Sequence, residues 1–423
     1  MTSILLIGFA VFLAISIPVA VSLGFSSLLA MQVQGTPLIL LAQSVFESLD
    51  SFSLMAIPFF VLAGNLMQAG GIAQRLVNLA NAIVGWVRGG LGSVVVLSTM
   101  FFSTMSGSSS ATTAAIGSTM IPSMEKKGYP RNFAAAITAS SGELGAILPP
   151  SIPMIVYALS ANVSVASLFL AGVVPGILIG LSLMLVVWIR ARVVGFDQVD
   201  SITFQQWLGN VGRALADALL ALLMPVIILG GIYGGFFTTT EAAVVAVLYA
   251  LVVGVGIYRE LAWRDLLDIF GRSAVTSAII LIIVGFASIF AYLLTVNQVP
   301  HKLGEFLTSV SDNPYVFLLM VNLALFLIGM VMETLAAIII LAPILAPAAL
   351  HFGIDPIHFG AIMIVNLAVG MVTPPVGVNL FVACQVANLR LEQLMRPLML
   401  FLGVLIINIF IITYVPALTT WMH

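Results

Sequence analysis

Charge is the scarcest property of this sequence. Only 7% of its 423 residues are charged, whereas 61% are hydrophobic. A soluble domain usually carries about 25% charged residues, which it needs to cover its surface. A protein surrounded by lipid needs no such cover, provided that its backbone groups are paired within helices. The composition therefore excludes an ordinary soluble protein and predicts an all-α polytopic membrane protein.

Cysteine, histidine and basic runs are also sparse. The single cysteine, Cys384, excludes an intramolecular disulfide and a cysteine-based metal cluster. None of the four histidines falls at a predicted membrane depth, which argues against an intramembrane Ser–His hydrolase. No run of Lys and Arg resembles those that follow nucleic acid. We expect no enzyme and no nucleic-acid partner, and we expect the lipid bilayer as the surroundings.

Apolar segments long enough to cross a bilayer, about 20 residues each, recur along the whole chain. The apolar N-terminus has no basic region before it and no clear cleavage site, so a retained helix is expected. The first half, 1–192, is predicted to hold short helices over 2–32 broken near Pro18, an amphipathic segment over 37–50, a span over 52–69, an interfacial segment over 71–88, a re-entrant hairpin over 91–122, a broken helix over 131–161 and a span over 168–189. The second half, 218–423, follows a cytoplasmic linker over 193–217 and is predicted to hold spans over 219–235 and 241–257, an amphipathic segment over 260–271, a span over 273–296, a hairpin over 314–347, a broken helix over 356–388 and a span over 398–415.

The two halves repeat the same order of elements. The pattern Gly-x-x-x-Pro-Pro occurs at Gly145 to Pro150 and again at Gly370 to Pro375, each time beside a predicted hairpin. Each half then has five spans and one hairpin, and because five is odd, the second half enters the membrane upside down. Inverted repeats of this kind are typical of secondary transporters. A simpler interpretation makes each proline pair a tolerated kink.

Basic residues give the orientation. In this topology every Lys and Arg except Lys302 falls on one side of the membrane. Basic residues favour the cytoplasm, so both termini are predicted to be periplasmic. One continuous helix over 2–32 would instead place the N-terminus inside.

The proline pairs predict ion sites. Proline removes backbone N–H donors and frees carbonyls, and a broken helix persists in a membrane where it lines a cavity or binds an ion. Carbonyl and hydroxyl oxygens suit a dehydrated cation such as Na⁺. The predicted ligands of a first Na⁺ site are Ser103, Ser106, Gly145, Leu148 and Pro150, and those of a second site are Gly329, Thr334, Gly370, Thr373 and Pro375.

The polar hairpin tips predict a substrate site. Neither tip holds Lys or Arg, so an anionic substrate relies on helix dipoles, hydroxyls and bound cations. Three alternatives stay open: the serines over 106–110 form a packing seam, Glu333 caps the following helix, and Glu143 is a buried structural acid. The predicted substrate-binding residues are Ser108, Ser109, Thr112, Glu333 and Asn366.

Several segments resemble the large membrane subunit of the tripartite ATP-independent periplasmic (TRAP) transporters. Residues 234–243, GGFFTTTEAA, resemble its Gly-x-Phe-Thr-x-Thr-Glu-Ala signature, although Thr239 stands where the family often has proline. Residues 56–64, AIPFFVLAG, resemble a second signature segment. Residues 106–112 and 145–150 resemble its first hairpin tip and broken helix, and 366–379 resemble the second.

The resemblance implies a Na⁺-driven transport subunit of a bacterial inner membrane that works by an elevator-type movement. It also implies a small four-helix membrane subunit and a periplasmic substrate-binding protein as partners, and no organic cofactor. The implied solute is a carboxylate, with sialic acid as the leading expectation and a C4-dicarboxylate or another carboxylate as the alternative. A stand-alone Na⁺/anion symporter, or a channel, is the competing class.

Overall fold

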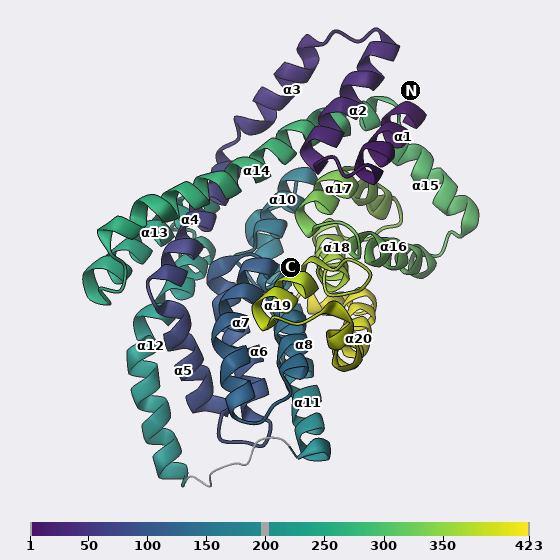
Figure 1. Ribbon diagram of the computed structural model, residues 1–423. Helices are drawn as coiled ribbons and strands as arrows, with labels where there is room; N and C mark the ends of the chain where they lie inside the picture. Colours follow the sequence, from purple (N-terminus) through teal and green to yellow (C-terminus); the bar gives the residue numbers. More distant parts are fainter. Residues whose placement is uncertain (1, 196–202, 422–423) are drawn as a thin grey trace.

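Helices account for most of the computed structural model, which describes residues 2–195 and 203–421 (Figure 1). Within these ranges, seven helices are long and apolar enough to cross a membrane, or eight if the bent pair Arg131–Ile147 and Ile152–Ser160 counts as one span. The all-α membrane fold is confirmed. The count is lower than the predicted ten spans because several predicted spans are broken or short, such as the 13-residue and 16-residue helices at the N-terminus.

The first half of the chain follows the predicted order of elements. Its helices are α1 (Thr2–Ala14), α2 (Val19–Gln34), α3 (Ile39–Leu49), η1 (Phe52–Met55), α4 (Ala56–Ala69), α5 (Ile72–Val84), α6 (Gly90–Ser106), α7 (Ser109–Lys126), α8 (Arg131–Gly142), α9 (Leu144–Ile147), α10 (Ile152–Ser160) and α11 (Val165–Val194). The break before Pro18 is confirmed, since two short helices and not one long helix cover 2–32.

The second half departs from the prediction in three places. The predicted linker is helical from Phe204 onward, and its residues 196–202 lie outside the described part. The predicted segments 260–271 and 273–296 form one continuous helix, and the second arm of the second hairpin is long enough to span. The helices are α12 (Phe204–Tyr233), α13 (Thr239–Leu251), η2 (Val252–Ile257), α14 (Trp263–Val296), α15 (Val299–Val310), α16 (Pro314–Gly329), α17 (Thr334–His351), α18 (Pro356–Gly370), α19 (Val378–Ala387), α20 (Leu391–Tyr414) and η3 (Pro416–Leu418).

Local chemistry sets where several of these helices begin. Thr238 and Glu241 form a capping box at the start of α13: the Thr238 hydroxyl accepts from the Glu241 N–H, and the Glu241 carboxylate accepts from the Thr238 N–H at 2.8 Å. Ser108 and Ser151 cap α7 and α10 in the same sense. Each cap satisfies backbone N–H donors that the first turn of a helix leaves unpaired.

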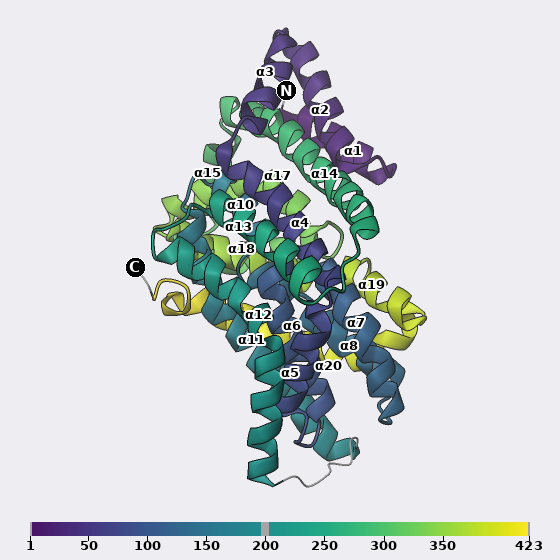
Figure 2. The ribbon, with the colours of Figure 1, turned by 90° about the vertical axis from the view of Figure 1, so that its left-hand side faces the viewer.

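We call the helices α1–α5 and α12–α15 the scaffold, and the helices α6–α11 and α16–α20 the core unit. In both views of the ribbon α14 runs diagonally across the molecule, and it packs on α2, α3, α4 and α17 (Figures 1 and 2). The long helix α14 thus joins the scaffold to the core unit.

The two halves of the chain interlock within the core unit. Helix α19, after the second break, packs on α7 of the first hairpin, and α10, after the first break, packs on α17 of the second hairpin. Helix α20 also packs on α8, and α18 on α11. The two hairpins and the two broken helices therefore form one packed body.

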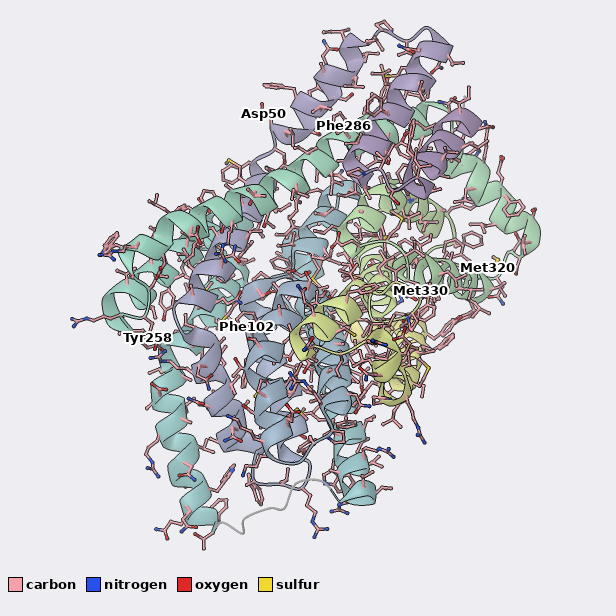
Figure 3. All side chains as sticks on the ribbon, viewed as in Figure 1. Asp50, Phe102, Tyr258, Phe286, Met320 and Met330 are labelled. Carbon is pink, nitrogen blue, oxygen red and sulfur yellow. The ribbon has the colours of Figure 1, made fainter. Side chains whose placement is uncertain are left out.

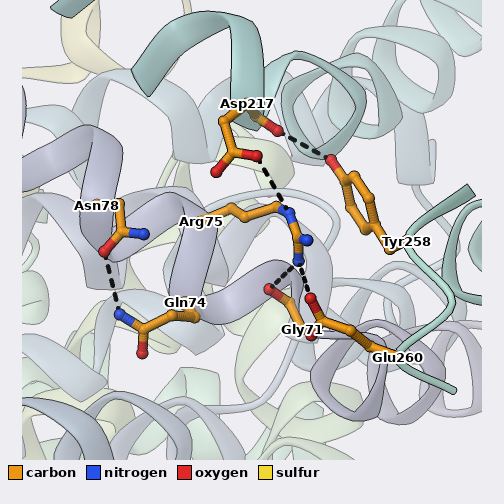
Figure 4. Close-up of polar contacts among 7 residues, drawn as sticks. All are labelled: Gly71, Gln74, Arg75, Asn78, Asp217, Tyr258 and Glu260. Atoms are coloured by element: carbon orange, nitrogen blue, oxygen red, sulfur yellow. Dashed lines mark hydrogen bonds and ion pairs between the residues drawn. The ribbon is translucent and has the colours of Figure 1, made fainter. Parts of the chain in front are cut away.

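A charged cluster ties the scaffold together (Figure 4). The Arg75 guanidinium of α5 is 2.7 Å from the Glu260 carboxylate and 3.6 Å from that of Asp217. It also lies 3.7 Å from the centre of the Tyr258 ring and donates to the Gly71 carbonyl. Because Asp217 belongs to α12 and Glu260 precedes α14, one side chain connects the two halves of the scaffold.

Candidate functional site

One cavity of about 770 Å³ brings both hairpin tips together. Phe102 of α6 lines the cavity, and Met330 lies between α16 and α17, at the turn of the second hairpin. Both residues are labelled in Figure 3. The polar residues that line the cavity are Ser106, Ser108, Ser109 and Ser110 of the first tip, Glu333 and Thr334 of the second, and Asn65, Gln68, Thr276 and Gln385 of the surrounding helices.

Hydroxyl groups organise the first tip. The Ser106 hydroxyl donates to the Ser108 carbonyl at 3.1 Å and accepts from the Thr112 hydroxyl at 3.0 Å. The tip also packs closely on α4, since a Cβ atom added to Gly64 would lie 3.3 Å from the Met105 carbonyl oxygen. Both interpretations of this serine run therefore fit the geometry: it is a packing seam, and it faces the cavity.

The first break lies directly against the first tip. The Ile152 N–H donates to the Gly107 carbonyl at 3.2 Å, so the chain after the break is bonded to the tip. A Cβ atom on Gly145 would lie 2.5 Å from the Ser108 carbonyl oxygen, which leaves room for glycine alone. Gly107 has a φ of +61°, and its added Cβ would be 3.0 Å from the Pro150 carbonyl oxygen. Backbone oxygens of the tip and the break thus converge.

The second tip is capped by an acid. The Glu333 carboxylate accepts from the N–H groups of Leu335 and Ala336, at 3.0 and 3.4 Å. The prediction that Glu333 caps the following helix is confirmed. Because Glu333 also lines the cavity, the cap places a carboxylate where a ligand would lie.

The second break repeats the arrangement of the first. The Gly377 N–H donates to the Met330 carbonyl of the tip at 3.1 Å. Gly329 and Gly370 are in backbone contact, since a Cβ on Gly370 would lie 2.6 Å from the Gly329 Cα. The buried Thr373 hydroxyl donates to the Val369 carbonyl at 2.8 Å and keeps its lone pairs. Each break is therefore joined to its own tip by a main-chain hydrogen bond.

The predicted ion ligands fall at these two contacts. Of the first set, Ser103 is buried in α6, and Leu148 and Pro150 form the buried break beside Gly107. The second set is less enclosed, because Pro375 is exposed. The Thr334 hydroxyl is buried and in contact with the sulfur of Met371, 2.7 Å away.

The predicted substrate residues divide into two groups. Ser108, Ser109 and Glu333 line the cavity. Thr112 lies behind the tip and is bonded to Ser106. Asn366 is buried in α18, where its amide donates to the side-chain oxygen Oδ1 of Asn322 at 2.9 Å, and it does not line the cavity.

Polar residues of the scaffold complete the lining and were not predicted. Asn65 and Gln68 interrupt the otherwise apolar helix α4, and Thr276 projects from α14. The Asn65 amide donates to the Ser273 hydroxyl at 2.8 Å, which orients it. Polar side chains at membrane depth are costly and usually functional, and this signal in the sequence was available for both amides of α4.

The electrostatics of the cavity favour a polar ligand with oxygen groups. No Lys or Arg is among the described residues that line it. The N-termini of α7 and α17 both meet the cavity, and helix N-termini favour anions. The Glu333 carboxylate repels an anion in the same space, whereas it can accept a hydrogen bond from a hydroxyl group.

Comparison with known proteins gives a consistent result. Residues 6–418 match the family described as "Tripartite ATP-independent periplasmic transporter, DctM component". The chain is 44% identical over 379 residues to the C4-dicarboxylate TRAP transporter large permease protein DctM of Pseudomonas aeruginosa, covering 90% of this chain and 88% of that protein. It is 37% identical over 378 residues to the sialic acid TRAP transporter large permease protein SiaM of Vibrio cholerae, covering 89% of this chain and 88% of that one.

A longer relative and a solved structure add to this. The chain is 43% identical over 412 residues to the isethionate TRAP transporter permease protein DctMQ of Oleidesulfovibrio alaskensis. The match covers 97% of this chain but only 64% of that protein, which is longer. The crystal structure of the Alcanivorax borkumensis YdaH transporter is similar with a TM-score of 0.64 and 16% identity, over 91% of this chain and 88% of that one. At this identity the likeness concerns the fold alone.

Proposed function

This chain belongs to the DctM family of tripartite ATP-independent periplasmic transporters, and from that premise we propose that it is the subunit through which such a system imports an organic acid. It is a transporter permease and not an enzyme. The observation that carries the proposal is the cavity in which the two hairpin tips and the N-termini of α7 and α17 meet. A solute bound there contacts both halves of the chain.

Na⁺ is the proposed coupling ion. Each tip and its break bring carbonyls and hydroxyls together, at Ser106, Gly145 and Pro150 and again at Gly329, Gly370 and Thr373. Groups of uncharged oxygen ligands, such as these carbonyls and hydroxyls, suit a monovalent cation. Two bound cations beside the cavity would also offset the charge of Glu333 and of a carboxylate ligand.

Alternating access is proposed to occur by an elevator-type movement of the core unit against the scaffold. The matched order of elements in the two halves supports an inverted repeat, and the interlocked packing supports a rigid moving body. We place both termini in the periplasm on the same topology. The stationary side of the cavity would be formed by α14, α2 and α4, which line it through Thr276, Val19 and Asn65.

The proposed solute is a hydroxyl-bearing carboxylate. Glu333, Gln68 and Gln385 offer the cavity hydrogen-bond acceptors, which the hydroxyl groups of a solute can meet and which a carboxylate, having no donor, cannot. A sialic acid has the hydroxyls to meet them, so it is the first candidate, with a C4-dicarboxylate and isethionate as competitors.

Two partners complete the proposed system. One is a small membrane subunit, for which the length beyond this chain in the fused DctMQ relative leaves room. The other is a periplasmic binding protein that delivers the solute.

Reconstituted uptake tests the proposal. Liposomes containing this chain with the small subunit should take up labelled sialic acid when an inward Na⁺ gradient and the binding protein are both present, and K⁺ should not replace Na⁺. Uptake by the chain alone, without any binding protein, would identify a stand-alone symporter. Solute flux that does not depend on the Na⁺ gradient and does not saturate would identify a channel.

A further inference from the structure

A buried hydrogen bond joins the two broken helices directly. Glu143 lies between α8 and α9, and Asn379 lies in the first turn of α19. The Asn379 Nδ2 donates to the Glu143 Oε1 at 2.7 Å, and both side chains have 0% exposure. The contact connects residues of the first and second halves in the middle of the core unit.

This pair is costly for a purely structural contact. Among the described residues, the second carboxylate oxygen of Glu143 and the amide oxygen of Asn379 have no hydrogen-bond partner. A buried polar atom left unpaired costs about 1–3 kcal/mol, and apolar residues of similar volume often replace buried polar pairs without loss of stability. A role beyond stability therefore accounts better for the pair.

Each partner is attached to one of the two breaks. Glu143 stands two residues before Gly145, whose backbone contacts the Ser108 carbonyl of the first tip. The Asn379 backbone N–H donates to the Met371 carbonyl at 3.1 Å, next to Gly370 and the second tip. A shift of either break moves one end of the Glu143–Asn379 bond.

We propose that the Glu143–Asn379 hydrogen bond couples the two ion sites, so that a cation bound at one break favours binding at the other. The inference rests on the proposed function, because it presupposes a cation site at each break. A cation that orders the first break fixes Glu143, which fixes Asn379 and the second break. The second cation then meets a site that is already ordered and loses less conformational entropy. Coupling of this kind is reciprocal. Both residues are positioning residues and not ion ligands.

Equilibrium binding of ²²Na⁺ to the purified full chain tests the coupling. Two coupled sites give a Hill coefficient that approaches about 2. Asn379→Leu keeps the branched shape of the side chain and removes the donor, so the coefficient should fall to about 1 while binding still saturates. Glu143→Gln keeps an acceptor for Asn379 and should retain the wild-type coefficient, whereas a merely structural role predicts an unchanged coefficient in Asn379→Leu as well.

A matched control comes from α20. Asn408 is also buried, and its amide donates to the Ser182 hydroxyl of α11 at 2.7 Å, a contact away from both breaks. Asn408→Leu removes a comparable bond and should leave the Hill coefficient unchanged. If Asn379→Leu does not fold, Glu143→Met removes the same bond from the other side.

The outcomes separate the two proposals. An unchanged Hill coefficient in folded Asn379→Leu or folded Glu143→Met would overturn the coupling and leave the proposed function standing. A wild-type Hill coefficient of about 1 with saturable Na⁺ binding would do the same. A wild-type chain that binds no Na⁺ would overturn the Na⁺-coupled function, and the coupling with it.

Discussion

Thr373 illustrates how one hydroxyl can be kept available inside an apolar helix. Its proton is used by the Val369 carbonyl, so its lone pairs remain for a cation beside the break. Thr373→Ala should weaken Na⁺ binding by about 1–3 kcal/mol, by analogy with an unmade buried hydrogen bond. Half-maximal uptake would then need about 5- to 150-fold more Na⁺. Ser106→Ala should act in the same direction at the first site.

The control for Thr373 is Thr138. It is equally buried, in α8, and its hydroxyl donates to the Ala134 carbonyl at 2.8 Å in the same intrahelical manner. Thr138→Ala should leave the Na⁺ dependence of uptake unchanged. If Thr373→Ala and Ser106→Ala both keep the wild-type dependence while folding normally, neither hydroxyl is a ligand.

Glu333 has two roles that a single substitution can separate. Glu333→Gln keeps an oxygen that accepts from Leu335 and Ala336, so the cap survives and thermal stability should change little. Loss of the charge in the cavity should change the half-saturating solute concentration about 10-fold or more, since hydrogen bonds to charged groups contribute about 1.5–3 kcal/mol. Uptake titrations at saturating Na⁺ measure this.

Asp355 offers the matched comparison. It caps α18 through the N–H groups of Ile357 and His358, each at 2.9 Å, and it does not line the cavity. Asp355→Asn should leave solute affinity unaltered. If Glu333→Gln and Asp355→Asn had equal effects on solute affinity, Glu333 would be a capping residue and nothing more.

At the scale of elements, the Arg75 cluster predicts a large stability difference. Arg75→Met removes a half-buried cation that holds α5, α12 and the segment before α14 together, and should cost about 2–3 kcal/mol in unfolding free energy. Arg272 pairs with Asp268 at 2.6 Å on the exposed face of α14, and such pairs contribute about 0.3–0.5 kcal/mol. Arg272→Met should therefore lower the melting temperature far less than Arg75→Met, and a similar loss in both would refute a bracing role for Arg75.

The elements that local chemistry determines could be predicted from the sequence. Proline pairs and polar tips mark the breaks and the hairpins, and the capping box at Thr238 marks the start of α13. The continuity of α14 could not be predicted, because Gly271 costs a helix only about 1 kcal/mol and packing on the neighbouring helices outweighs it. The start of α12 did have a local signal, since the Gln206 side chain accepts from the Thr203 N–H.

The candidate site was predictable only where it is made of local sequence. The two tips carry their own polarity, so Ser108, Ser109 and Glu333 could be named. The contributions of Asn65 and Thr276 depend on how α4 and α14 pack against the tips, which residues far apart in the chain decide. Asn366 was misleading for the same reason, because a polar residue beside a break can be used by a neighbouring helix, here through Asn322.

For the whole molecule, the topology gives a labelling prediction. Single cysteines at Lys127 and Arg259, both exposed, should be protected from an impermeant thiol reagent added outside intact cells, and one at Asp312 should react. The native Cys384 is buried and is replaced by alanine first. Labelling in the opposite sense would rule out the proposed orientation.

The interlocking of the two halves has a consequence for how the protein is made. Glu143 enters the membrane 236 residues before its partner Asn379 has been synthesised. At ribosomal rates of about 5–20 residues per second, that interval lasts roughly 10–50 s. During this time the first half holds a carboxyl group and a helix break that nothing of the second half yet covers. The nascent first half must therefore be sheltered, by the insertion machinery or by a loosely closed arrangement of its own, until α19 arrives.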